Sequence, residues 1–221
     1  MKTIFITTAM IMATLLSSAQ LKGSGKTSTK TYDYKNFDKI YFDDLDGKLE
    51  IEIGTTWSIT VTIDDNLQEL LAFSENNSEK ELTIYFKGNT NNNLYIEDTH
   101  IKIKVTMPIA LAVRHNGNSQ LTVTNITGST FRFENNGNAT TKISGTVTYL
   151  EIKNIGNGDV NAENLKAKTA NIKSSGNGNV NVNVLETITA KASGNSCVRN
   201  KGKALFDDNS SNSGNSRLLN L

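Results

Sequence analysis

Six glycines in the second half of the chain recur at an almost constant interval. They lie 20, 19, 20, 18 and 20 residues apart, and asparagine follows each of them: Gly117, Gly137, Gly156, Gly176, Gly194 and Gly214. A fixed period near twenty residues is typical of repeat architectures, in which each unit packs against a copy of itself. Catalytic loops are seldom copied in this way. The period therefore restricts the chain to folds built from repeated structural units.

Each repeat is predicted to contain two short strands around the Gly-Asn turn. The residues four positions before the first five glycines are apolar, and those three positions before them are charged: Arg114, Glu134, Lys153, Lys173 and Lys191. Successive side chains of a strand point to opposite faces, so we expect the apolar set to face a core and the charged set to face solvent.

Two all-β folds fit this layout. In a meander of hairpins, neighbouring strands would run antiparallel and the Asn-Gly pairs would form tight turns. In a β-solenoid of about 20 residues per coil, equivalent residues would stack at about 4.8 Å. The solenoid is favoured because stacking explains a constant pair: glycine adopts the positive φ of a corner, and asparagine amides hydrogen-bond along the stack. The predicted structural corner residues are Gly117, Asn118, Gly137, Asn138, Gly156, Asn157, Gly176, Asn177, Gly194 and Asn195.

The segment before the repeats is predicted to form half-buried strands. From Phe37 to Met107, apolar and polar residues alternate in runs such as Leu49–Ile53 and Ile59–Ile63. Asp46-Gly47, between two such runs, is typical of a tight hairpin turn. Only Asn66–Phe73 has the spacing of a short helix.

The first residues indicate export. A positive charge, a short apolar stretch and a small-residue cleavage site are typical of a secretory signal peptide, here residues 1–19. The apolar stretch is too short to span a bilayer comfortably, so we expect no transmembrane segment in the mature chain. Residues 20–33 are expected to form a polar linker. Gly23–Thr27 within it resembles the end of a phosphate-binding loop but lacks that motif's first glycine and its strand–helix setting.

Composition argues against nucleic-acid binding and against a metal site. The 23 basic and 22 acidic residues give a formal net charge of +1, without the basic excess of nucleic-acid-binding proteins. The two histidines, His100 and His115, are expected at the surface and have no companions at metal-ligand spacing, so neither a metal site nor a cofactor is expected. Cys197 is the only cysteine and is expected to face outward, either as a plain small side chain or as a reactive or intermolecular thiol.

Catalysis would require carboxylates that converge on one face. Asp159 is alone at its repeat offset, and Glu134, Glu151 and Glu163 fall at different offsets among lysines. The acidic residues between Asp43 and Glu50 lack the order of a calcium-binding loop. No catalytic residue is therefore assigned, although a carbohydrate-active enzyme, either a polysaccharide lyase or a hydrolase, remains the alternative to a binding protein.

The mature chain resembles the head GIN domain family of auto-transporter adhesins, typical of secreted proteins from Bacteroidetes. The resemblance is carried by Tyr34–Ile40, Ile59–Leu67, Leu82–Ile84 and the Gly-Asn-Gly-Asp-Val element at Gly156–Val160. It implies a right-handed single-stranded β-helix with an N-terminal sheet region, and a periplasmic, cell-surface or extracellular location. The domain would span residues 34–221, with strands in 34–108 and repeat coils in 109–221.

The sequence thus predicts a non-enzymatic adhesin or cell-envelope binding protein that presents a rigid, polar β-helix surface. Its partners would be glycans or other molecules of a host or envelope surface, met through many weak contacts. The asparagine row is interpreted as structural, with glycan contact as the alternative. A self-associating envelope scaffold, and hence a homo-oligomer, is a further alternative, because the last coil of a stack exposes strand edges.

Overall fold

The structure is a computed structural model that describes residues 19–88 and 94–221; the expected signal peptide falls almost entirely outside the described residues. The described chain is all-β apart from one 3-10 turn, η1 (Asp65–Leu67). Fifteen strands form one sheet, and β1 pairs with β8 in a separate one. The strands are β1 (Ala19–Lys22), β2 (Thr27–Tyr32), β3 (Lys39–Asp43), β4 (Gly47–Ile53), β5 (Ser58–Asp64), β6 (Leu71–Asn76), β7 (Glu81–Phe86), β8 (Leu94–Glu97), β9 (Ile101–Met107), β10 (Ala112–Asn116), β11 (Gln120–Asn135), β12 (Thr140–Gly156), β13 (Val160–Gly176), β14 (Asn179–Gly194), β15 (Cys197–Asn200), β16 (Ser211–Asn212) and β17 (Arg217–Asn220).

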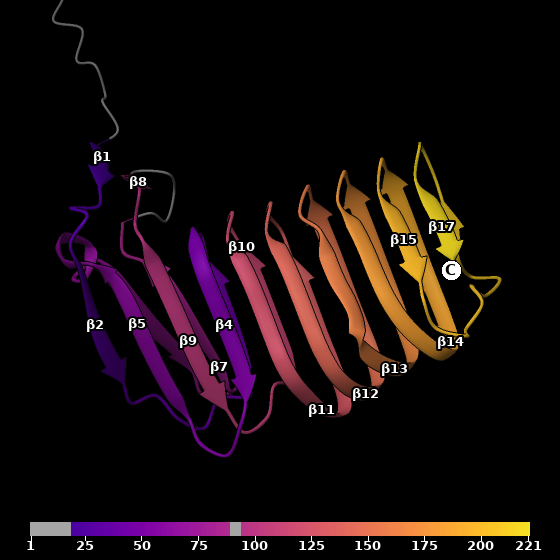
Figure 1. The fold of residues 1–221 in the computed structure, drawn as a ribbon, viewed down its shortest axis with the longest axis horizontal. Helices are drawn as coiled ribbons and strands as arrows, with labels where there is room; N and C mark the ends of the chain where they lie inside the picture. The colour runs from indigo at the N-terminus through magenta and orange to yellow at the C-terminus, as the bar shows by residue number, and fades with distance from the viewer. Residues whose placement is uncertain (1–18, 89–93) are drawn as a thin grey trace, which may run out of the picture.

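The four long strands β11 to β14 lie side by side and run parallel (Figure 1). Each residue pairs with one about a repeat later: Phe133 lies opposite Ile152, which lies opposite Ile172, which lies opposite Ala190. Antiparallel neighbours, which a meander of hairpins requires, do not occur between these strands. The repeat period of the sequence therefore equals the sequence separation between residues that pair on neighbouring strands.

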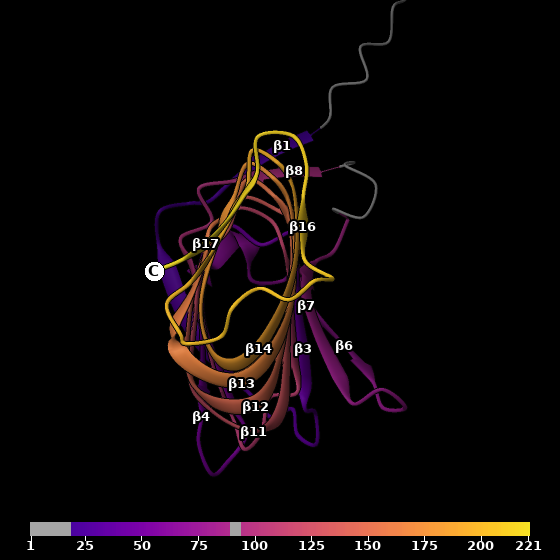
Figure 2. The same cartoon turned by 90° about the vertical axis from the view of Figure 1, so that its right-hand side faces the viewer.

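Each long strand curves, so that its two ends contact different partners. The beginning of β11, Gln120–Thr124, pairs with β4. Its end, residues 132–135, pairs instead with residues 112–115 of β10. Figure 2 shows β11 to β14 bending through the bottom of the view, with their two halves on opposite sides of the molecule. The inward side chains of the two halves enclose the core between them.

The N-terminal strands belong to the same stack. β3 pairs in parallel with β10, and β4 pairs in parallel with β11, so residues 39–53 form a further layer in register with the repeats. β7 and β9 form the next layer outward, on β3 and β4 respectively. The predicted hairpin at Asp46-Gly47 is therefore wrong: the strands on either side of it, β3 and β4, pair with other layers and not with each other.

Antiparallel strands cover the N-terminal end of the stack. β5 pairs with β9, β2 pairs with β5, and β6 pairs with β7. Residues 20–33 differ from the expected linker, because β2 lies within them and is part of the sheet. The helical spacing at Asn66–Phe73 is misleading: a three-residue 3-10 turn precedes β6, whose pairing with β7 overrides the local pattern.

The core follows the predicted alternation. Phe131, Phe133, Leu150 and Ile152 are fully buried, as is almost every apolar residue at their repeat offsets. Burying each large apolar side chain contributes about 1.5–3 kcal/mol before entropy is counted. One contiguous cluster of buried residues runs from Phe37 to Ala204, so the N-terminal strands and the repeats share a single core.

Close packing between layers explains why glycine recurs at the corner. A Cβ at Gly156 would lie 2.5 Å from the backbone oxygen of Gly137, and a Cβ at Gly137 or Gly176 would collide with the oxygen of the preceding corner glycine. Gly156 also has a φ of +132°, a conformation that side chains rarely adopt. Space thus requires glycine at these corners, and at Gly156 the backbone conformation requires it as well.

We predict that Gly156→Ala lowers the free energy of unfolding by about 2 kcal/mol more than Gly128→Ala does. Gly128 is a matched control, since its φ is +140° but a Cβ there would meet nothing within 4 Å. The two substitutions share the conformational strain and differ in the steric clash. Urea denaturation of both variants measures the difference, and equal losses would show that the layers are not packed this closely at the corner.

Candidate binding surface

Six asparagines, one from each repeat, form a continuous hydrogen-bonded row that we call the asparagine ladder. After the first, each side-chain amide donates to the amide oxygen of the preceding layer, over 2.6–3.0 Å, and all six residues are exposed. The backbone reinforces the row, because the N–H of Asn177 donates to the carbonyl of Gly156 at 3.0 Å, and Asn138, Asn195 and Asn215 make the equivalent bond. The ladder consists of Asn118, Asn138, Asn157, Asn177, Asn195 and Asn215.

The ladder still has hydrogen-bonding capacity toward solvent. A carboxamide has two N–H donors and an oxygen with two lone pairs. Each interior amide uses one donor and accepts one bond along the row, as Asn157 does with Asn138 and Asn177. The remaining donor and lone pair of each exposed amide recur at every layer. The structure thus brings together all the predicted corner residues in one evenly spaced polar edge.

A second polar row runs inside the corner and was not predicted. His115, Asn135 and Asn154 lie two residues before the corner glycines and are fully buried. Asn135 donates to Asn154 Oδ1 at 2.8 Å, and Asn154 donates to the carbonyl of Gly158 at 2.8 Å. Their shared offset in the repeat is the signal by which the sequence could have revealed this row.

His115 is thus not a surface residue, as expected from the sequence, but a buried member of the inner row. Its Nδ1 lies 3.2 Å from Asn135 Oδ1, and its Nε2 lies 2.6 Å from Ser119 Oγ. Burial lowers the pKa of His115, while the bond to Asn135 and the nearby carboxylate of Asp46 act in the opposite direction. A neutral ring that donates at Nδ1 and accepts at Nε2 satisfies both contacts.

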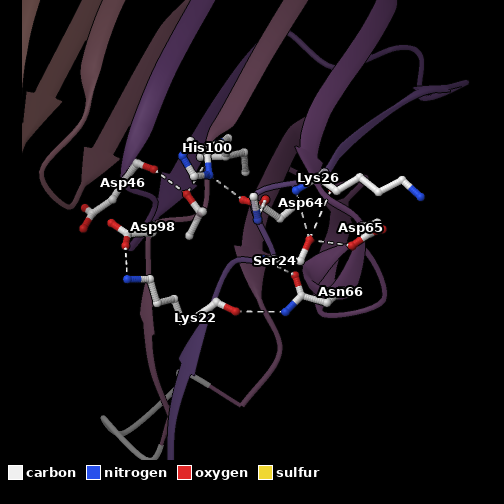
Figure 3. A network of polar contacts seen from close by, with 12 residues as sticks. Lys22, Ser24, Lys26, Asp46, Asp64, Asp65, Asn66, Asp98 and His100 are labelled. Carbon is white, nitrogen blue, oxygen red and sulfur yellow. Dashed lines mark hydrogen bonds and ion pairs between the residues drawn. The ribbon is translucent and has the colours of Figure 1, made fainter.

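A cleft of about 580 Å³ lies at the N-terminal end of the molecule, lined by residues that include Asp46, Lys48, Asp98 and His100. Figure 3 shows the polar network around it. The carboxylate of Asp64 is fully buried, accepts a hydrogen bond from the N–H of Gly25 at 2.7 Å and lies 2.8 Å from His100 Nδ1. The phosphate-loop-like segment Gly23–Thr27 therefore wraps an internal carboxylate.

The other acidic groups of this region are also engaged. Asp98 forms an ion pair with Lys22 at 2.8 Å, and Asp46 accepts a hydrogen bond from the N–H of Asn118 at 3.0 Å. Asp43 accepts hydrogen bonds from Tyr41 and Asn116. Within residues 19–88 and 94–221, no group of three or more His, Cys, Asp or Glu side chains is arranged to hold a metal ion. This arrangement stabilises the end of the stack through internal contacts.

Carboxylates on the repeat layers do not converge. Asp159 accepts two hydrogen bonds from Asn179, through the backbone N–H at 2.7 Å and the side-chain amide at 3.0 Å. Glu134 bonds to Lys153 at 2.7 Å; burial opposes ionisation of Glu134, but hydrogen bonds from Lys153 and Asn136 hold its pKa below the usual value. These groups are paired within the sheet, an arrangement typical of a solvated strand face.

The structure corrects the position of Cys197. Its sequence offset predicted an outward side chain, but only 7% of the residue is exposed. In the sheet it lies between Asn179 and Arg217, whose side chains are longer. A short side chain between two longer ones is covered by them, which the offset alone could not indicate. A readily reactive thiol is not favoured at this position.

Residues 36–204 match the family described as "Putative auto-transporter adhesin, head GIN domain". The chain therefore belongs to the head GIN domain family. No curated protein matches its sequence. Within the residues that the structure describes, no helix is long and apolar enough to cross a membrane.

Solved structures share the fold. A putative adhesin from Bacteroides fragilis is 18% identical, with a TM-score of 0.70, and the match covers 91% of this chain and 100% of that one. A putative adhesin from Parabacteroides merdae is 18% identical, with a TM-score of 0.56 and coverage of 92% and 99%. A putative lipid binding protein from Parabacteroides distasonis is 19% identical, with a TM-score of 0.57 and coverage of 91% and 99%. At these identities the likeness establishes the fold.

The ladder leads to a prediction about its interior. Asn157→Ala removes two ladder hydrogen bonds and should lower the free energy of unfolding by about 1 kcal/mol, whereas Asn215→Ala removes one and should cost about half as much. Chemical denaturation of both variants measures the two losses. Losses that are equal, or that are larger for Asn215, would contradict a row in which each amide both donates and accepts.

His115 leads to a prediction about pH. Because its pKa in the folded protein is below 6.5, the unfolded chain takes up the proton more readily, and stability falls as pH drops below 6.5. Asn occupies the same offset in the next two repeats, so His115→Asn should fold and lose this titration. As pH falls from about 8 to about 5, the free energy of unfolding of the wild type should therefore decrease relative to that of His115→Asn. Parallel stability curves over that range would contradict the assignment.

Proposed function

We propose that this protein is an exported, non-enzymatic adhesin or cell-envelope binding protein that presents the rigid polar surface of a right-handed β-helix. Membership of the head GIN domain family supports the adhesive role. The parallel, in-register layers and the curvature of β11 to β14 support a coiled path of about 20 residues per turn. Residues 1–19 would serve as the export signal. Residues 20–33 would connect that signal to the rest of the domain and supply β2 to the sheet.

The observation that carries the proposal is the asparagine ladder, together with the polar faces beside it. The ladder repeats the same exposed amide at each of six layers. A periodic ligand such as a glycan chain can meet such an edge at several layers at once, and weak contacts that are linked in this way add to a useful affinity. The hydrogen bonds along the ladder hold the amides in place, which reduces the entropy lost on binding.

A self-associating scaffold is the second candidate, favoured by the uneven ends of the stack. Antiparallel strands cover the N-terminal end, but at the other end β15 is the only strand of the described chain that pairs with β17. Leu219 and Leu221 there are 38% and 71% exposed. An open strand edge with apolar side chains invites pairing with a second chain. Light scattering at high concentration distinguishes this role, which predicts oligomers, from a monomeric adhesin.

Adhesion is tested by the retention of purified protein on a panel of neutral and acidic glycans, host matrix proteins and lipid vesicles, with folding verified by circular dichroism. The lipid vesicles are included because one structural neighbour is named as a lipid binding protein. The proposal predicts retention on at least one surface polymer at moderate salt. Background binding to the whole panel by folded protein would overturn it, and release of cleaved product from a polysaccharide would favour the carbohydrate-active enzyme.

A further inference from the structure

The outward row that contains Lys153, Lys173 and Lys191 changes character along the stack. In register it begins with Arg114, Glu134 and Lys153 and continues with Lys173 and Lys191 on β13 and β14. The charges of the first members are neutralised by ion pairs, since Arg114 pairs with Glu81 at 2.8 Å and Lys153 pairs with Glu134 at 2.7 Å. Lys173 and Lys191 have no ion-pair partner among the described residues and are exposed.

The position of these two lysines is electrostatically unfavourable in the unliganded protein. They are direct neighbours on adjacent parallel strands, about 4.8 Å apart at the backbone. Like charges directly opposite each other in a sheet destabilise it. An anion between the two ammonium groups would convert this repulsion into attraction, because each ammonium can donate a charge-assisted hydrogen bond.

The surroundings complete an anion site. A groove of about 340 Å³, which we call the lysine groove, is lined by Lys153, Lys173 and Lys191 and by the hydroxyl-bearing residues Ser175, Ser193 and Ser211. None of the described residues that line it is acidic. Glu134, on the row itself, is held by Lys153, and Asp207 accepts hydrogen bonds from Thr189 and Ser210. Ammonium and hydroxyl donors without competing carboxylates are suited to a tetrahedral oxyanion.

We propose that the lysine groove binds a sulfate or phosphate group, carried as an ester on a glycan or present as the free ion. The glycan-borne source rests on the proposed adhesive function, and for that source the groove defines the ligand class: a sulfated or phosphorylated carbohydrate. The asparagine ladder runs along the same layers, so a chain anchored at the groove by its anionic group could extend over neutral contacts. Binding is expected to weaken as ionic strength rises, because the ammonium groups are exposed.

The test is a calorimetric titration of the purified mature chain with lactose 3′-sulfate, mannose 6-phosphate, inorganic sulfate, inorganic phosphate, lactose and mannose. Wild type should bind the anionic probes and not the neutral sugars. Tighter binding of the esters than of the free ions identifies an anionic glycan as the source, and equal binding identifies a free-anion site. Failure to bind any anionic probe, or equal binding of lactose and its sulfate, would overturn the proposal.

Variants locate the site. Lys173→Gln with Lys191→Gln should lower the affinity for the anionic probes about tenfold, through the loss of two charge-assisted contacts in a partly open groove. Lys142→Gln with Lys166→Gln removes the same charge from other positions of β12 and β13 that have no ion pair among the described residues, and should change the affinity less than about twofold. Equal losses in both double variants would overturn the assignment to the groove.

A third variant separates binding from folding. Lys191→Glu should abolish anion binding yet fold at least as stably as wild type, because it places a carboxylate opposite Lys173. Anion binding that survives in this variant would contradict the site. The proposed adhesive function can fail independently: the panel of surfaces can stay at background while the sulfate titration succeeds, or the protein can be retained on a neutral polymer with no dependence on Lys173 and Lys191.

Discussion

The structure depends on one constraint, the parallel, in-register pairing of strands whose equivalent residues are about twenty positions apart. In such a stack, each residue lies directly against its counterpart in the next layer. A residue type can recur at one offset only if it tolerates itself as a neighbour at about 4.8 Å. Apolar residues do so by packing in the core, asparagines by bonding amide to amide, and corner glycines by leaving room for the backbone above. Lysines do so less well, because their charges repel each other, and Lys173 and Lys191 are one such pair.

The repeat part of the fold could be read from the sequence because its signal is this same constraint. The Gly-Asn period gave the parallel register, and the alternation around it separated buried Phe133 and Ile152 from their exposed neighbours. Residues 39–53 contain no Gly-Asn pair, so the repeat pattern does not reveal them as a layer, although Asp46 accepts a hydrogen bond from the backbone N–H of Asn118 at the corner. The sequence also does not reveal the order of the layers. β7 pairs with β3 and β9 pairs with β4, and these partners are far apart in the sequence. Cys197 and His115 were misplaced because their burial depends on neighbouring layers.

The candidate surfaces follow from the same geometry. An exposed amide that recurs at each layer provides many equivalent weak contacts. Charged residues that recur at one offset form ion pairs, as Glu134 and Lys153 do, or leave like charges side by side, as at the lysine groove. The N-terminal cleft contrasts with both. Its buried carboxylate Asp64 is held by Gly25 and His100, so its polar groups stabilise the covered end of the stack. Recognition by this protein is therefore expected on the long faces of the stack and not in a pocket at its end.

The most direct test of this account is disulfide trapping between equivalent corner residues. In a Cys197→Ser background, Asn157→Cys with Asn177→Cys places two thiols on adjacent layers, within the Cα separation of about 4.4–6.8 Å that a disulfide needs. Under mild oxidation the account predicts rapid, nearly complete formation of an intramolecular disulfide, detected by mass spectrometry. Asn157→Cys with Asn195→Cys, two layers apart, should form little. Failure of the first pair to cross-link in folded protein, or equal cross-linking of both pairs, would contradict the in-register stack.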